Sequence, residues 1–522
     1  MEKKWWTLLA VSLGTFMLLL DITIVTVALP AIQHDLHANF SDLQWVVDAY
    51  ALTLAALLLT AGSLADLFGR RLLFAIGLAV FTAGSLLCGT ATGPLYLIIA
   101  RSGQGVGGAI MLATSLALLA QAFQGRDRGV AFAVWGTVVA TAVAVGPLLG
   151  GVLTTGISWR WIFFVNVPIG VVALAVTIAR VVESRQEGAR RPDWAGFVLF
   201  TGALVSLVYG LIRASQTSWT DLGVLLCFAG AAVLAVAFLV AEHLGRHPMF
   251  DLRLFRVPAF DGGLVASFAV SASLYSLLLY LVLYLQDALG YSALQAGVRM
   301  LVVSGGTFAT SALAGRLSAR VPPRWLIAPG LLLVGVGLLL MAQLHASSTW
   351  MVLVPGFVVA GLGNGITNPP LASTAVGVVE PHRAGMASGI NNTFRQVGVA
   401  TGIAALGSIF ATRQASDLAA ALHRVPALGH ATSQVAAAVR NGATGAQVAA
   451  LAPPSLRPAL AAALRASFVR GLDEILVIAG VVALVGAVGA LVLIRNRDFV
   501  AGSQVHAGAQ ERRADELPAG VA

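Results

Sequence analysis

Three charged side chains lie inside long apolar stretches, and they are the residues with the clearest chemical potential. Asp21, Asp48 and Arg101 each stand among mostly apolar or small neighbours. An ionisable group inside a membrane span is costly and marks a functional site by default. A carboxyl group in such a place can hold a proton and release it when its surroundings change, so proton transfer is the first chemistry that the pattern suggests.

Asp21 is the acid placed most clearly within an apolar run. We expect it to carry the proton and to contact the substrate. The alternative is that Asp21 only hydrogen-bonds Thr23, Thr26 or a neighbouring helix for packing. Asp48 and the nearby Tyr50 are further candidates for substrate contact, and Asp48 could share the proton coupling. Asp48 could equally cap a helix at the membrane interface.

Other kinds of chemistry are not indicated. The sequence contains no nucleophile–base set, metal-ligand cluster, phosphate-binding loop or nucleotide-binding domain. We therefore predict neither an enzyme, nor a metal site, nor a cofactor, and expect the proton motive force to supply the energy. Cys88 and Cys227 lie in separate apolar runs and are interpreted as small packed side chains.

The composition places these residues in a membrane. Of 522 residues, 58% are hydrophobic and only 11% are charged. Soluble globular proteins are about 45–50% apolar and about 25% charged. Such an excess of apolar surface is tolerated only in lipid, and continuous runs about 20 residues long indicate helices rather than a β-barrel. We predict an all-α integral membrane protein.

Fourteen apolar runs are long enough to cross a bilayer. They lie at about 6–30, 45–65, 72–93, 95–121, 130–154, 161–181, 194–213, 220–242, 262–286, 295–318, 325–345, 350–378, 387–412 and 472–494. An even number of spans places both termini on the same side of the membrane.

Arginine and lysine concentrate in alternate loops. One set of loops holds Lys3, Lys4, Arg70, Arg71, Arg126, Arg128, Arg180, Arg185, Arg190, Arg191, Arg246, Arg253, Arg256, Arg320, Arg324, Arg383, Arg495 and Arg497. The opposite short loops contain little beyond Arg160 and Arg213. The positive-inside rule then predicts both termini in the cytoplasm of a bacterial inner membrane. The net charge of +9 is attributed to this topology and not to nucleic acid.

The chain also repeats itself. Gly62-Ser-Leu-Ala-Asp66 recurs in degraded form as Gly315-Arg-Leu-Ser-Ala319. Two pseudosymmetric six-helix halves around an inserted helix pair are therefore expected, an architecture of secondary transporters. The predicted divisions are an N-terminal half at 1–181, the inserted pair with linkers at 182–261, the first five helices of the C-terminal half at 262–412, an extracytoplasmic loop at 413–470, a last span at 471–496 and a disordered cytoplasmic tail at 497–522.

A ten-residue loop after the second span resembles the loop between helices 2 and 3 of the major facilitator superfamily. It reads Gly62-Ser-Leu-Ala-Asp66-Leu-Phe-Gly69-Arg70-Arg71. Glycine permits a tight turn, Asp66 can accept hydrogen bonds from a neighbouring helix N-terminus, and Arg70 can pair with an acid across the cytoplasmic face. The resemblance implies a latch that holds the inner gate shut in one conformation. Plain positive-inside charge is the alternative.

Two glycine-rich stretches also resemble family motifs. Arg101-Ser-Gly-Gln-Gly105-Val-Gly-Gly-Ala looks like the second motif, which implies gating, whereas snorkelling of Arg101 to the outer interface is the alternative. Gly146-Pro147-Leu-Leu-Gly150-Gly151 resembles the motif that marks exporters. Proline bends a helix and glycines give it a smooth face, although both residues are common in spans by chance.

Further stretches refine the resemblance. The run from Trp159 to Pro168 is typical of exporters with fourteen spans, and Thr26 stands where the family usually has asparagine. Arg395, in Asn391-Asn-Thr-Phe-Arg395-Gln, belongs to a motif near the cytoplasmic gate. The span at 295–318 contains no acid, so the handling of dications by some relatives should not be assumed here.

The chain is thus identified as a member of the drug:proton antiporter family with fourteen spans, of the quaternary-ammonium and multidrug exporter type. The resemblance implies a monomer in membrane lipid that exchanges protons inward for small amphipathic, cationic drugs or antibiotics outward by alternating access. A dedicated exporter of one metabolite, lipid or siderophore is the first alternative. A membrane receptor or scaffold without turnover is the second.

Overall fold

The structure is a computed structural model. It describes residues 2–123, 125–185, 193–245, 252–318, 321–379, 384–423 and 456–499, together with positions 250 and 448. The predicted tail lies almost wholly outside these residues, and so does most of the loop predicted at 413–470.

Fourteen helices in the described residues are long and apolar enough to cross a membrane, which confirms the predicted number of spans. The N-terminal half contains α1 (Lys3–Leu36), α2 (Phe40–Phe68), α3 (Arg70–Gly89), α4 (Pro94–Ala122), α5 (Gly125–Gly156) and a sixth span divided into α6 (Trp161–Phe164) and α7 (Asn166–Arg180). The inserted pair is α8 (Trp194–Gln216) and α9 (Leu222–Leu244).

The C-terminal half begins with a short 3-10 helix, η1 (Leu252–Arg256). Its first span combines α10 (Pro258–Val270), the π-helical η2 (Ser271–Tyr275), α11 (Ser276–Leu283) and the π-helical η3 (Tyr284–Ala288). The remaining helices are α12 (Ala293–Leu317), α13 (Arg324–Met341), η4 (Trp350–Leu353), α14 (Val354–Gly377), α15 (Ala384–His423), α18 (Arg457–Leu493) and η8 (Asn496–Asp498). No strand occurs among the described residues.

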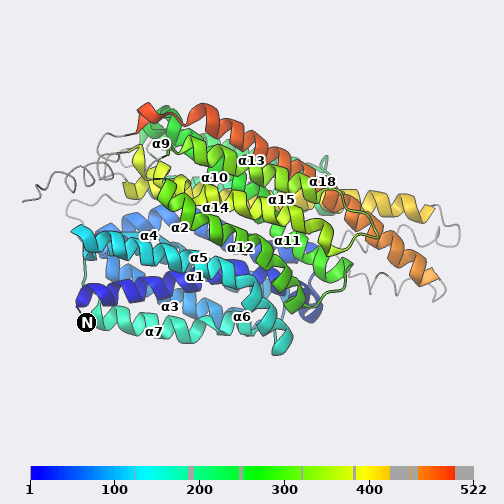
Figure 1. Cartoon of the computed structure of the whole chain (residues 1–522), viewed down its shortest axis with the longest axis horizontal. Coiled ribbons are helices and arrows are strands. Elements are labelled where there is room, and N and C mark those ends of the chain that lie inside the picture. The colour runs from blue at the N-terminus through cyan, green and yellow to red at the C-terminus, as the bar shows by residue number, and fades with distance from the viewer. Residues whose placement is uncertain are drawn as a thin grey trace, which may run out of the picture.

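The helices run side by side and define two ends of the bundle (Figure 1). We call the end where α1 begins and α18 finishes the terminal end, and the opposite end, where α1 finishes, the distal end. The N-terminal half, blue to cyan, occupies the lower part of the view, and the C-terminal half, green to red, the upper part.

Two helices extend beyond the bundle at the distal end. α15 continues to His423 and α18 already begins at Arg457, so both run well past the predicted span ends at 412 and 472. Much of the described part of 413–470 is therefore helix rather than loop. Arg413 and Arg470 both pair with Asp417. These ion pairs hold α15 and α18 together where the sequence becomes less hydrophobic. A search for apolar runs does not detect such helix extensions.

The inserted pair covers the seam between the halves. Ala51, Leu52 and Ala55 of α2 form one apolar cluster with Leu204 and Val208 of α8, and α15 completes it. On α9, by contrast, many large apolar side chains are exposed in the isolated chain, as expected for a surface that faces lipid.

The halves are joined toward the distal end. The Gln44 side chain donates a hydrogen bond to the Ile403 carbonyl at 3.1 Å, and the Gln286 side chain donates to the Val27 carbonyl at 2.8 Å. A β-carbon on Gly151 of α5 would come within 2.7 Å of the Ala293 carbonyl oxygen of α12. Glycine therefore permits the backbone contact between α5 and α12 here.

Candidate functional site

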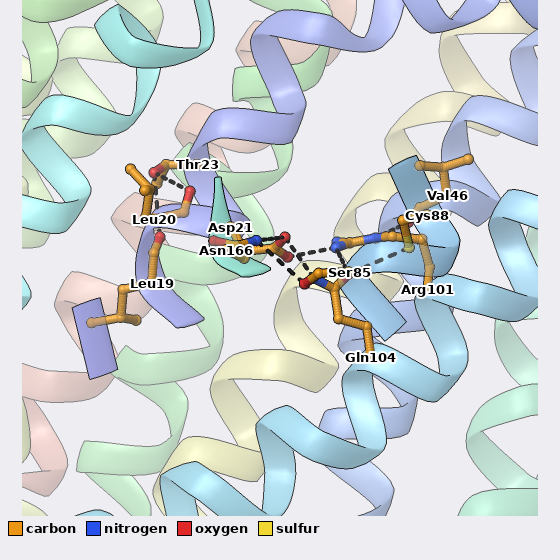
Figure 2. A network of polar contacts seen from close by, with 10 residues as sticks. All are labelled: Leu19, Leu20, Asp21, Thr23, Val46, Ser85, Cys88, Arg101, Gln104 and Asn166. Atoms are coloured by element: carbon orange, nitrogen blue, oxygen red, sulfur yellow. Dashed lines mark hydrogen bonds and ion pairs between the residues drawn. The ribbon is translucent and has the colours of Figure 1, made fainter. Parts of the chain in front are cut away.

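Asp21 is held by donors from two other helices inside the N-terminal half (Figure 2). Arg101 of α4 donates from Nη1 to Oδ2 at 2.5 Å, and Gln104 donates from Nε2 to Oδ1 at 2.8 Å. Asn166 of α7 donates to Oδ1 at 3.2 Å. The Asp21 side chain is wholly buried. Asp21 therefore has the partners that an ionised carboxylate needs when it is buried.

Arg101 is satisfied on its other sides as well. It donates to the Val46 carbonyl of α2 at 3.1 Å and to the Gln104 side chain at 2.7 Å. Its guanidinium lies over the Tyr50 ring, 4.3 Å from the ring centre. Arg101 is 1% exposed, so the snorkelling alternative is wrong: the side chain turns toward Asp21 instead of toward the interface.

These contacts correct one expectation about Asp21. Asp21 is not a lone charge in an apolar run, because Arg101 supplies a full counter-charge. Thr23 and Thr26 donate to main-chain carbonyls of α1 and not to Asp21, so this part of the packing alternative is wrong too. Its other part, a bond to a neighbouring helix, is what occurs.

Asp48 has the opposite surroundings. Its side chain is fully buried, and neither carboxylate oxygen has a hydrogen-bond partner among the residues that the structure describes. It lies one turn after Gln44, on the face of α2 that contacts the C-terminal half, because residues four apart share a helix face. Tyr280 of α11, which donates to the same Ile403 carbonyl as Gln44, lies within electrostatic range of Asp48.

The helix-capping alternative for Asp48 is wrong. The residues that cap α2 are Asn39 and Asp42, whose side chains each accept a hydrogen bond from the other's main-chain N–H at 2.9 Å. Tyr50, two positions after Asp48, points to nearly the opposite face of α2 and packs on Arg101. Tyr50 thus belongs to the Asp21 network and is separated from Asp48 by the helix itself.

The loop between α2 and α3 is fastened by an acid that sequence reasoning missed. Glu183, in the segment after α7, accepts from the main-chain N–H groups of Arg71 at 3.0 Å and Leu72 at 3.1 Å. Gly69, at φ +118°, passes so close that a β-carbon would lie 2.6 Å from the Glu183 carboxylate. Glutamate at the first turn of α3 is favoured by the partial positive charge there.

The expected partners of Asp66 and Arg70 are therefore corrected. Asp66 caps no helix in this conformation; it pairs with Arg70 at 2.9 Å, one turn away. Arg70 in turn does not reach across to a distant acid. The signal that could have identified Glu183 is an acid three residues beyond α7, on the same side as the basic loop.

The glycines of the other motifs allow close helix contacts. A β-carbon on Gly105 would lie 2.8 Å from the Tyr50 carbonyl oxygen, and one on Gly150 would lie 2.8 Å from the Ile24 carbonyl oxygen. Gly146 packs against Thr23, and Gly297 of α12 packs against the carbonyl of Pro147. Gly62, by contrast, faces open space, because a β-carbon there would meet no neighbouring atom within 4 Å.

A small cavity of about 30 Å³ lies between the halves. The N-terminal half contributes α1 and α5 to its wall, and the C-terminal half contributes η2, α11, α12 and α14. The lining residues are Thr23, Thr26, Val27, Val143, Pro147, Leu274, Tyr275, Leu278, Met300, Val303, Ser304, Thr307 and Asn364. Asp21, Asp48 and Tyr50, the predicted substrate contacts, are not among them.

The sequence comparison decides the family. Residues 11–403 match the model described as Major Facilitator Superfamily. The chain belongs to the major facilitator superfamily. It is a multi-pass membrane transporter of small molecules and not an enzyme, and the resemblance stated from its motifs is confirmed.

Relatives of this transporter include resistance proteins. It is 38% identical over 419 residues to "Multidrug resistance protein Stp" of Mycobacterium tuberculosis, covering 80% of this chain and 78% of that protein. It is 34% identical over 496 residues to "Tetracenomycin C resistance and export protein" of Streptomyces glaucescens, and the match covers 94% of this chain and 91% of that protein.

Solved structures show the same fold. A bacterial homologue of the human lysosomal transporter Spinster, in an inward-facing and occupied conformation, matches with a TM-score of 0.60 at 16% identity. The match covers 95% of this transporter and 98% of that chain. The predicted all-α major facilitator fold is thereby confirmed.

Proposed function

We propose that this transporter exports small amphipathic drugs or antibiotics in exchange for protons, by alternating access. The names of the relatives, which concern multidrug and antibiotic resistance and export, support the class of cargo. The cavity between the halves supports alternating access, because the halves can rock about a central site. Both halves belong to one chain, so a monomer suffices, and the proton gradient replaces a cofactor.

The observation that carries the proton coupling is Asp48. An ionised carboxylate without partners costs several kcal/mol to bury, whereas the protonated acid costs far less. With the distal end closed, Asp48 is buried without a partner, so closure favours the protonated form. Opening of the halves would admit water to this face of α2 and allow the proton to exchange. Asp21, which was our first choice for the carrier, keeps its counter-charge within one half.

We place the terminal end in the cytoplasm of a bacterial inner membrane, as the arginine distribution indicates. The distal end, with Asp48 nearby, then faces outward, where the proton concentration is higher. Single-cysteine labelling tests this orientation: Val505→Cys should react only from the cytoplasm and His430→Cys only from outside. Reaction of both from the same face would contradict the proposed topology.

The experiment for the function is flux in proteoliposomes with an imposed pH gradient and no ATP. A panel of antibiotics and dyes should include at least one compound that moves uphill, and a protonophore should stop this movement. Uphill movement that is insensitive to the protonophore would refute antiport.

A dedicated exporter of one metabolite is the second candidate. Of the relatives named above, the one from Streptomyces glaucescens covers the larger share of this chain, and it is named after a single compound. The same panel separates the candidates, because a dedicated exporter moves one chemical family only. A receptor or scaffold would move none.

A further inference from the structure

The polar groups of the central cavity are concentrated on the wall from the C-terminal half. Asn364 of α14 donates to the Tyr275 hydroxyl at 3.3 Å and to the Thr307 hydroxyl at 3.2 Å. Asn368, one turn later, donates to the Asn364 side-chain oxygen at 2.9 Å and approaches the Tyr275 hydroxyl at 3.5 Å. On the opposite wall, Val27, Val143 and Pro147 are apolar. The two threonines of that wall, Thr23 and Thr26, donate their hydroxyls to main-chain carbonyls of α1.

One hydroxyl of this polar wall can donate to a ligand. The Tyr275 oxygen accepts from Asn364 and Asn368, which leaves its own O–H to donate into the cavity that Tyr275 lines. A hydroxyl that already accepts hydrogen bonds is a stronger donor.

The charges around the cavity disfavour a cation. Its lining contains no acid. The guanidinium of Arg395 lies 5.9 Å from the Tyr275 ring centre, and it forms no ion pair in the part of the chain that the structure describes. Asp21 points away from the cavity side of α1 that Thr23 marks, as Figure 2 shows. A desolvated cation would therefore find a like charge and no counter-charge.

We propose that the substrate is a neutral or anionic amphipath that presents a carbonyl acceptor on an apolar ring system, and not an organic cation. The carbonyl accepts from the Tyr275 hydroxyl. A carboxylate on the same compound is attracted by Arg395. This inference rests on the proposed export function and replaces our expectation of cationic cargo.

The test uses three ring compounds of matched size on the full chain. They are anthraquinone, its 2-carboxylate, and the analogue with a trimethylammonium group in place of the carboxylate. Binding to the purified protein is measured by fluorescence titration, and export is measured in proteoliposomes with a pH gradient. The neutral and anionic compounds should bind about tenfold or more tightly than the cation.

Two variants connect this preference to the cavity. Tyr275→Phe keeps the ring and should weaken binding of the neutral compound about three- to tenfold, as expected for one lost hydrogen bond. Tyr96→Phe, at a tyrosine exposed on the outside of the bundle, is the matched control and should change nothing. Arg395→Gln should weaken the carboxylate and leave the neutral compound unchanged, a difference that a merely structural role would not produce.

The outcomes separate this inference from the proposed function. Proton-driven export of the cation with no binding of the other two compounds would overturn the inference and leave antiport standing. Equal binding of all three compounds, unaffected by Arg395→Gln, would overturn it as well. If no compound from these three or from the wider panel is moved, both proposals fall.

Discussion

Asp21 and Asp48 look alike in the sequence, since each is an acid among apolar residues, but the structure gives them opposite surroundings. Asp21 accepts from Arg101, Gln104 and Asn166, all within the N-terminal half. Asp48 accepts from no group in the described part of the chain and faces the C-terminal half. The surroundings of Asp21 stabilise a charged carboxylate, whereas the surroundings of Asp48 favour a neutral acid.

This difference indicates how proton coupling and stability are divided in the molecule. A group that changes its charge during transport must lack a permanent counter-charge, and it must lie where the two conformations differ. Asp48 meets both conditions because it lies toward the other half. Asp21 meets neither, because α1, α4 and α7 of one half enclose it and are expected to move together.

The largest effect is expected from breaking the Asp21 network. Arg101→Leu leaves Asp21 buried without its counter-charge, and removal of one partner of a buried pair costs about 3–5 kcal/mol. We expect little folded protein in detergent, measured by size-exclusion chromatography and thermal unfolding. The double variant Asp21→Asn/Arg101→Leu should recover part of the loss. Normal stability of the single variant would show that Asp21 is not ionised.

The second-largest effect is expected from Asp48→Asn, which should impair transport and leave stability nearly unchanged. Asp48→Asn removes the titratable proton, so gradient-driven uphill flux should fall to the background level while downhill exchange continues. Thermal stability should change by less than about 1 kcal/mol, because a neutral amide replaces a neutral acid. Asp42→Asn, at the α2 cap, is the matched control and should retain uphill flux. If the Asp48→Asn variant still shows uphill flux, Asp48 is not the proton carrier and Asp21 becomes the leading candidate again.

A smaller effect is expected at the loop between α2 and α3. Two further acids there, Glu183 and Asp66, also differ in the partners that stabilise their charge. Glu183→Gln weakens two hydrogen bonds of a charged acceptor, each worth about 1.5–3 kcal/mol. Asp66→Asn removes only a partly exposed pair with Arg70, worth about 0.2–1 kcal/mol. Measured as the change in thermal unfolding and in turnover, the first substitution should have the larger effect. Should Asp66→Asn abolish turnover instead, Asp66 must act in another conformation.

The smallest effect is expected from Tyr50→Phe. The Tyr50 hydroxyl has no hydrogen-bond partner, while its ring lies against Arg101. Loss of the hydroxyl should change stability by less than about 0.5 kcal/mol and leave proton-driven flux intact. Tyr50→Leu, which removes the ring, should cost more, because cation–π contacts contribute about 0.5–2 kcal/mol. Equal effects of the two substitutions would mean that the ring does not support Arg101.

The sequence by itself determined the fourteen spans and the family. Hydropathy is a local property, and the thickness of the bilayer fixes the length of each apolar run. For the same reason the sequence did not reveal where α15 ends and where α18 begins, since ion pairs such as Arg413–Asp417 carry these helices into polar sequence. The division of the sixth span into α6 and α7, and the π-helical turns η2 and η3, were not expected either.

Only the tertiary structure decided which acid carries a counter-charge. Arg101 lies 80 positions from Asp21, and Asn166 lies 145 positions from it. Glu183 meets Arg71 across 112 positions. No local pattern encodes such pairs, because they depend on which faces of separate helices pack together. The energy of a buried charge is set by the few donors within hydrogen-bond reach, and their identity is known only once the helices are in place.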